Sequence, residues 1–186
     1  DRWGLRASRD EPALYQPDGG GALADRARAA FVSSARAAGA EIVEHVRVVS
    51  LAAARRTVRV TTDRGELTAA AVVVTAGAWA PGLLAPLGIE LAVIPTRETV
   101  AYFAVPGAET LPSLIDAAIP TGGRHGIARR GVVSYAVSAP GVGLKAGLHH
   151  AGPPADPDEI GTADEAVVRW AGEWVESRYR AGVELV

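Results

Sequence analysis

Gly143-Leu144-Lys145-Ala146-Gly147-Leu148-His149 is the stretch that decides how the second half of this 186-residue chain folds. It indicates a β-strand, and residues 131–137 indicate another, joined to it by the turn Ser138-Ala139-Pro140-Gly141. Two strands with so short a connection predict an antiparallel sheet. Because residues four apart on a strand point to the same side, Lys145 and His149 are expected to share one face of this sheet.

Lys145 is the only lysine in the chain, which holds 19 basic residues in all. The composition is rich in alanine and arginine, and arginine can stand wherever only a charge is needed. A single lysine on this background has two interpretations. It marks a position that needs a compact, titratable ammonium, or it persists by chance.

The composition narrows the class of protein. The formal net charge of −2 gives no electrostatic reason to expect nucleic acid or an anionic membrane as a partner. There is no cysteine, so disulfides, thiolate metal sites and thiol nucleophiles are excluded within this chain, and no metal site is expected. No apolar run is long enough for a membrane span, and the charged N-terminus lacks the apolar core of a signal peptide. We therefore expect a cytoplasmic protein.

The chain contains no methionine and begins with Asp1. The simplest interpretation is an internal fragment of a longer polypeptide.

The first half predicts alternating helices and strands: a helix at 23–38 ended by Gly39, a strand at 41–50, a hairpin of 57–62 with 66–69, a buried strand at 71–75, and a short helix at 81–87. This order is typical of α/β proteins that bind nucleotides at strand ends. The glycines of residues 141–147 are not a phosphate loop, because the spacing is one residue too long and no helix follows.

The second half predicts a strand at 98–105, the two strands of the opening stretch, a turn or linker at 151–158, and a helix at 163–178 capped by Thr162 and Glu165. Trp170 and Trp174 are expected in the core. The charges of Asp116, Arg124, Arg129 and Arg130 are read as solvated loop charges. The fold class is therefore α+β. The change of character after about residue 91 predicts two parts, 1–92 and 93–186.

Three segments in order resemble the monomeric sarcosine oxidase and N-methyltryptophan oxidase family of D-amino-acid-oxidase-like flavoproteins. They are Gly20-Gly21-Ala22-Leu23 with the strand around Val46-Arg47-Val48, then Val72-Val73-Val74-Thr75-Ala76-Gly77-Ala78-Trp79, and finally Gly143 to His149. The resemblance implies an FAD-dependent amine oxidase, with a partial FAD-binding domain over 1–92 and a partial substrate domain over 93–186. Such an enzyme oxidises a secondary amino acid, sarcosine or an N-methyl amino acid, and reduces O₂ to H₂O₂.

The resemblance also implies residue roles. Lys145 would lie near the flavin ring and help O₂ accept electrons, and His149 would lie in the substrate pocket. The plainer alternatives are a solvated strand lysine and a register in which His150 takes the place of His149.

Val48 would contact the adenine through its main chain, and Ala76, Gly77 and Trp79 would approach the pyrophosphate and ribose of FAD. The alternatives are a core valine and a tight turn with a packed tryptophan.

Two departures from the family pattern bear on this expectation. The family's pocket aromatic would fall at Ser134, with Tyr135 one position away. The Gly-rich phosphate loop and the cysteine that holds flavin covalently would lie outside residues 1–186. We therefore expect this chain alone to bind FAD weakly or not at all and to be inactive. Apolar surface left uncovered could make it dimerise.

Other functions fit the same residues. One is a non-enzymatic α+β binding module. Within the same superfamily, a glycine or D-amino-acid oxidase and a flavin dehydrogenase that avoids oxygen are the alternatives.

Overall fold

The computed structural model describes residues 3–7, 10–117, 133–180 and 182–186, which form two compact units. Unit 1 consists of 1–22, 96–154 and 160–186, and unit 2 of 23–95 with 155–159. The residue ranges of the two units therefore differ from the expected ranges 1–92 and 93–186, because residues 1–22 belong to unit 1 and residues 155–159 to unit 2. The assignment of one part to FAD and the other to substrate stays a prediction.

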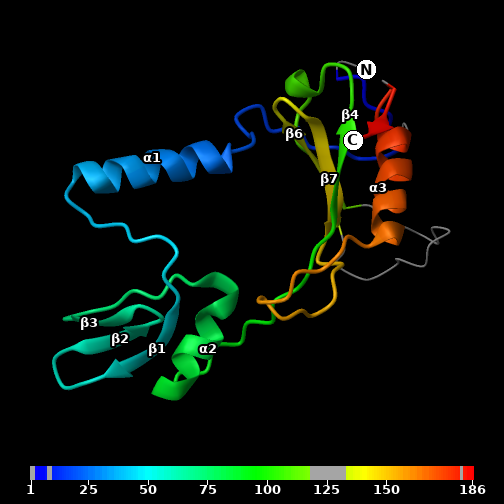
Figure 1. The fold of residues 1–186 in the computed structure, drawn as a ribbon. Helices are drawn as coiled ribbons and strands as arrows, with labels where there is room; N and C mark the ends of the chain where they lie inside the picture. The colour runs from blue at the N-terminus through cyan, green and yellow to red at the C-terminus, as the bar shows by residue number, and fades with distance from the viewer. Residues whose placement is uncertain (1–2, 8–9, 118–132, 181) are drawn as a thin grey trace. The chain divides into compact units, whose positions relative to one another are not determined.

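Unit 2 contains one long helix, a three-stranded antiparallel sheet and a short helical segment (Figure 1). Its elements are α1 (Ala24–Ala37), β1 (Val48–Ala53), β2 (Val58–Thr62), β3 (Gly65–Ala69), η1 (Gly77–Trp79), α2 (Ala80–Leu84) and η2 (Ala85–Leu87). The predicted helix and hairpin are confirmed. The first strand begins only at Val48, because His45 has a φ of 58° and breaks the extended conformation before it.

The prediction of a buried strand at 71–75 is wrong in this structure. Residues 71–76 form no strand, and Val73 is 84% exposed. An apolar run becomes a buried strand only when neighbouring strands satisfy its backbone and layers cover both faces. No strand in the described part of the chain pairs with this run.

Unit 2 has a small core. Among its described residues, the buried apolar side chains are those of Leu51 and Ala80. The apolar stripe that predicts α1 stays uncovered, and Phe31 is exposed on it. Dimerisation through apolar surface stays a prediction.

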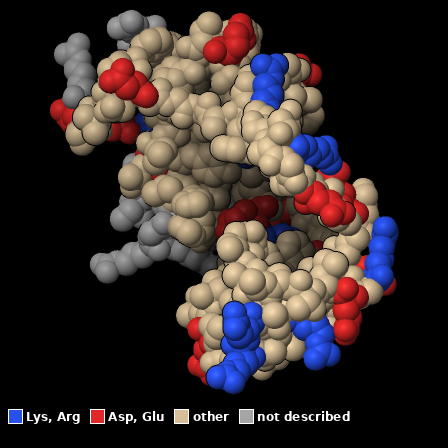
Figure 2. Space-filling view, turned by 90° about the vertical axis from the view of Figure 1, so that its left-hand side faces the viewer, with Lys and Arg blue, Asp and Glu red and all other residues tan. Residues whose placement is uncertain are grey.

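On the face of the molecule shown in Figure 2, basic and acidic side chains are mixed.

Unit 1 is built on an antiparallel sheet with the strand order β5-β6-β7-β4-β8 (Figure 1). The strands are β4 (Val100–Ala104), β5 (Leu114–Asp116), β6 (Val133–Ala139), β7 (Gly143–His149) and β8 (Glu184–Leu185), with η3 (Ala108–Thr110) after β4. The two strands predicted from the opening stretch pair antiparallel over their whole length, from Val133 opposite His149 to Ala139 opposite Gly143. The predicted antiparallel sheet and the α+β fold class are confirmed.

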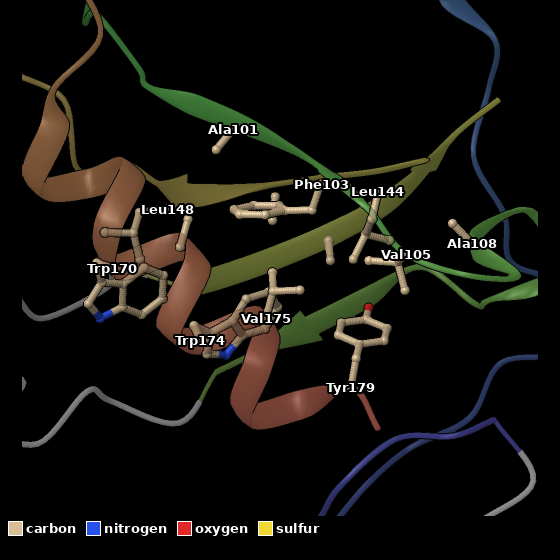
Figure 3. Close-up of a cluster of buried hydrophobic side chains, with 13 residues drawn as sticks. Ala101, Phe103, Val105, Ala108, Leu144, Leu148, Trp170, Trp174, Val175 and Tyr179 are labelled. Atoms are coloured by element: carbon tan, nitrogen blue, oxygen red, sulfur yellow. The ribbon is translucent and has the colours of Figure 1, made fainter. Parts of the chain in front are cut away.

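Helix α3 (Glu165–Arg178) packs against β4 and β7 and forms the core of unit 1 with them (Figure 3). Phe103, Leu144 and Leu148 meet Trp170, Trp174 and Val175, as predicted for the two tryptophans. The helix cap differs from the predicted one. Asp164, not Thr162, accepts hydrogen bonds from the amides of Ala166 and Val167, because its carboxylate stands at the position that caps the first turn.

Asp116 is not a solvated loop charge. Its Oδ2 accepts hydrogen bonds from the indole of Trp174 at 2.9 Å and from Arg178 Nε at 2.8 Å. Arg178 also makes a bidentate contact with Glu11. The amide of Arg6 donates a hydrogen bond to the carbonyl of Arg178, and Leu5 forms an isolated antiparallel β-bridge with Tyr179. These bonds attach the N-terminal segment to the end of α3. The predictions for Arg124, Arg129 and Arg130 lie outside the described residues.

Tyr179 follows α3, is 2% exposed, and points its hydroxyl into the core cluster (Figure 3). That hydroxyl has no hydrogen-bond partner among the described residues, and burial raises the pKa of Tyr179 to about 12. An unsatisfied buried hydroxyl costs free energy. Tyr179→Phe is therefore expected to raise the free energy of unfolding by about 1 kcal/mol at neutral pH, measured by urea unfolding.

The same substitution should change the response to alkali. Below pH 10.0 the phenol is protonated in both states; between 10.0 and about 12 the unfolded state loses its proton first, so the free energy of unfolding falls as pH rises. Tyr179→Phe should remove that part of the fall. Tyr15→Phe, which alters a half-exposed ring, is the control and should change neither quantity. Destabilisation by Tyr179→Phe at neutral pH would show that the hydroxyl is satisfied.

No helix among the described residues has the length and apolar character needed to cross a membrane.

Candidate functional site

The sheet of unit 1 has one face covered by α3 and one that α3 leaves open. Leu144, Ala146 and Leu148 of β7 are buried toward α3. Lys145, Gly147 and His149 alternate with them and therefore lie on the open face. The predicted sharing of one sheet face by Lys145 and His149 follows from this alternation.

Lys145 lies on β7, which has β6 on one side and β4 on the other. It is directly opposite Val137 of β6 and Tyr102 of β4. Side chains directly opposite one another in an antiparallel pair are close enough to touch. Val137 and Tyr102 therefore flank Lys145 on the open face of the sheet.

Tyr135 lies opposite Gly147, between Lys145 and His149 along the open face. A methyl group placed on Gly147 would be 3.3 Å from the hydroxyl of Tyr135. The ring of Tyr135 therefore leans over Gly147, and the missing side chain makes room for it. The ring also meets His149 edge to face, with centroids 6.5 Å apart.

Burial, first of all, raises the pKa of the Tyr135 hydroxyl, and the negative charge of Glu98 raises it further. Glu98 is held in place from several sides: its carboxylate accepts hydrogen bonds from the amides of Ala151 and Gly152 and from the hydroxyl of Thr96. Tyr135 therefore stays neutral near pH 7 and can donate a hydrogen bond from the open face.

Ser134 and Tyr135, the two residues considered for the family's pocket aromatic, lie on opposite faces of β6. Ser134 faces the core and is buried, whereas Tyr135 is on the face of Lys145 and His149. His150 lies beyond the strand with a φ of 61°, and its ring lies against that of His149 with the centroids 3.9 Å apart and the planes tilted by 50°. Sequence reasoning singled out Lys145 and His149 but not Tyr102. The alternation of strand 98–105 was the signal that could have placed Tyr102 on this face.

A second cluster lies within unit 2, at the predicted cofactor residues. Trp79 donates a hydrogen bond from its indole to Asp158 Oδ1 at 2.9 Å, and Arg47 NH2 contacts Asp158 Oδ2 at 2.5 Å. Arg47 directly precedes Val48, and Trp79 closes the turn that contains Ala76 and Gly77. The structure thus links the two predicted cofactor-binding segments through Asp158, which sequence reasoning assigned to a turn or linker.

The backbone of this second cluster is accessible to a ligand. Gly77 has a φ of 53°, and no atom lies within 4 Å of the position of an added Cβ. Val48 and Trp79 are both partly exposed. Val48 and the ring of Trp79 thus lie at the surface of unit 2, and the guanidinium of Arg47 shares the carboxylate of Asp158 with Trp79.

Comparison of the sequence with known protein families identifies the family of this chain. The family profile described as FAD dependent oxidoreductase, termed DAO, matches residues 2–185. The chain belongs to this family of FAD-dependent oxidoreductases.

Individual relatives are similar over part of their length. Monomeric sarcosine oxidase from Bacillus sp. strain B-0618 is 29% identical over 160 residues, which is 86% of this chain and 40% of the relative. Glycine oxidase from Pseudomonas aeruginosa is 40% identical over 75 residues, 40% of this chain and 19% of that protein. The chain therefore spans less than half the length of these curated relatives.

The fold is similar to that of NikD, an unusual amino acid oxidase essential for nikkomycin biosynthesis. The TM-score is 0.67 at 24% identity, over 85% of this chain and 41% of the NikD chain. This likeness concerns the fold.

Proposed function

We propose that this chain carries part of the active site of an FAD-dependent amine oxidase that acts on a secondary amino acid and reduces O₂ to H₂O₂. The observation that carries the proposal is the placement of Lys145 beside Tyr135 and His149 on the sheet face that α3 leaves open. The similarity to monomeric sarcosine oxidases favours sarcosine or another N-methyl amino acid as substrate.

FAD, when bound, would supply the chemistry of accepting a hydride equivalent from the amine. Lys145 contributes a fixed cation where negative charge develops on O₂ as it takes up electrons. Tyr102 and Val137 lie opposite Lys145 on the neighbouring strands and would restrict its stem, so that little rearrangement is needed when that charge develops.

His149 and Tyr135 would bind the substrate. The neutral Tyr135 hydroxyl can donate a hydrogen bond to a carboxylate, and His149 can donate or accept one beside it. Val48, Ala76, Gly77 and Trp79 would hold the adenosine and phosphate part of FAD.

A second candidate is a glycine oxidase. The 75-residue match to glycine oxidase at 40% identity favours it locally. The two candidates differ in whether the substrate nitrogen carries a methyl group, which is a difference in the apolar volume of the pocket.

The proposal is tested on the full-length enzyme. We expect a purified yellow protein that absorbs near 450 nm and produces peroxide from sarcosine faster than from glycine. The isolated 186-residue chain should bind FAD weakly or not at all and produce none. Turnover of glycine in preference to sarcosine would favour the second candidate. A full-length protein that binds no flavin would contradict both and favour a non-enzymatic module.

A further inference from the structure

Asp158 joins two segments of unit 2 that are far apart in sequence. Its two carboxylate oxygens have different partners: Oδ1 accepts from the indole of Trp79, and Oδ2 from the guanidinium of Arg47. Both partners lower the pKa of the Asp158 carboxyl, the Trp79 hydrogen bond first. The backbone amide of Asp158 donates a hydrogen bond to the side-chain oxygen Oδ1 of Asp156 at 2.9 Å, which holds the main chain at Asp158 in place.

Arg47 is fixed independently of its side chain. Its amide donates to Asp63 Oδ1, and its carbonyl accepts from the amide of Asp63. Immediately after it, the pairing of β1 with β2 shifts register between Val48 and Ser50. A bulge of this kind redirects the backbone groups beside it. The Arg47 side chain therefore extends from a well-defined corner of the hairpin toward Asp158.

These contacts are a weak source of stability. The side chains of Arg47 and Asp158 are 63% and 51% exposed, and exposed ion pairs contribute little to folding. Their main consequence is geometric. An indole whose N–H is held by a fixed carboxylate has one preferred ring orientation, and a guanidinium held at one end keeps its other donors directed.

We propose that Asp158 is a positioning residue for the cofactor. It fixes the ring of Trp79 and the guanidinium of Arg47, so that the corner at Val48 and the turn Ala76–Trp79 are held in one arrangement that accepts the adenosine diphosphate half of FAD. The positive charge of Arg47 offsets the negative charge of Asp158, so the pair does not repel the phosphates. This inference rests on the proposed function.

The experiment uses the full-length enzyme stripped of flavin and ADP as the probe, with calorimetry to measure the Kd. Asp158→Ala is expected to raise the Kd for ADP about tenfold. Asp158→Asn, which keeps an oxygen for the indole, should recover part of the affinity. Glu90→Ala, which removes an exposed carboxylate of the same unit, is the matched control and should change the Kd less than twofold.

A purely structural role is separated by two further readouts. The thermal midpoint of Asp158→Ala should match that of Glu90→Ala, because the contacts are exposed. The NMR signal of the Trp79 indole N–H should shift in Asp158→Ala and stay in place in Glu90→Ala. In the double variant Asp158→Ala/Trp79→Phe, the two losses of affinity should not add, because one hydrogen bond links the residues.

The outcomes distinguish this inference from the function on which it rests. Wild-type apoenzyme that does not bind ADP would overturn both. Wild-type binding with an unchanged Kd in Asp158→Ala would overturn the role of Asp158 and leave the cofactor assignment in place. If Asp158→Ala fails to fold, Asp158→Asn decides: an unchanged ADP affinity overturns the inference, and a loss of affinity together with a shifted Trp79 indole N–H signal supports it.

Discussion

Replacing Lys145 with methionine in the full-length enzyme is expected to slow reoxidation of the reduced flavin by O₂ by about 10²–10³-fold. Methionine keeps much of the length of the stem between Tyr102 and Val137 but removes the charge. The reductive half-reaction does not involve O₂, so it should keep its rate within a few-fold. Stopped-flow absorbance, with flavin reduction by anaerobic sarcosine and reoxidation by oxygenated buffer, measures the two steps separately.

Lys145→Arg is the matched variant, because it retains the charge in a larger, planar group. It should fall between wild type and Lys145→Met in reoxidation rate. A flavin dehydrogenase that avoids oxygen would respond to neither substitution, since its reduced flavin reacts slowly with O₂ from the start. An equal loss in both half-reactions would contradict the assignment of Lys145 to the oxygen step and point to general damage of the site.

Replacing Gly143 with alanine is expected to lower the free energy of unfolding by at least about 3 kcal/mol. Gly143 begins β7 with a φ of 137°, which L residues rarely adopt, and its Cβ would overlap the carbonyl oxygen of Phe103 in the neighbouring strand. The contact is with backbone, so no side-chain movement can relieve it. Denaturant unfolding of the 186-residue chain, followed by tryptophan fluorescence, measures the loss.

Gly141→Ala separates backbone strain from the steric clash. Gly141 also has a positive φ, 83°, but no atom lies within 4 Å of its would-be Cβ. Its substitution should cost about 1 kcal/mol. If the two variants lost equal stability, the close approach of β7 to Phe103 would not be the cause of the larger effect.

The strands β4, β6 and β7 of unit 1 were predictable because their information is local, whereas the short strands β5 and β8 were not predicted. Small and apolar residues alternate in strand period with the residues of the open face, and the short connection between β6 and β7 leaves few choices of pairing. The same period places Lys145 and His149 together. The strand period alone did not show whether Ser134 or Tyr135 shares the face of Lys145, because this depends on which of the two lies opposite Gly147.

The features that sequence reasoning missed depend on contacts between distant segments. An apolar run at 71–75 predicts a strand, but a strand also needs a partner, which no local pattern supplies. Asp158 lies in a Pro-rich stretch typical of a linker, and its role follows only from the arrival of Arg47 and Trp79, 111 and 79 residues earlier. Asp116 was misread for the same reason, since Trp174 and Arg178 approach it from the far end of the chain.

The bridge between Leu5 and Tyr179 has a consequence for biosynthesis. Leu5 is made long before Tyr179, so on the ribosome this bridge cannot form until α3 and Tyr179 have emerged. Such distant contacts make folding slow, because a long loop must close before they form. During that interval the face of β4 and β7 that later meets Trp170 and Trp174 is bare. Chaperone dependence during synthesis should therefore end only when the last turn of α3 has left the exit tunnel.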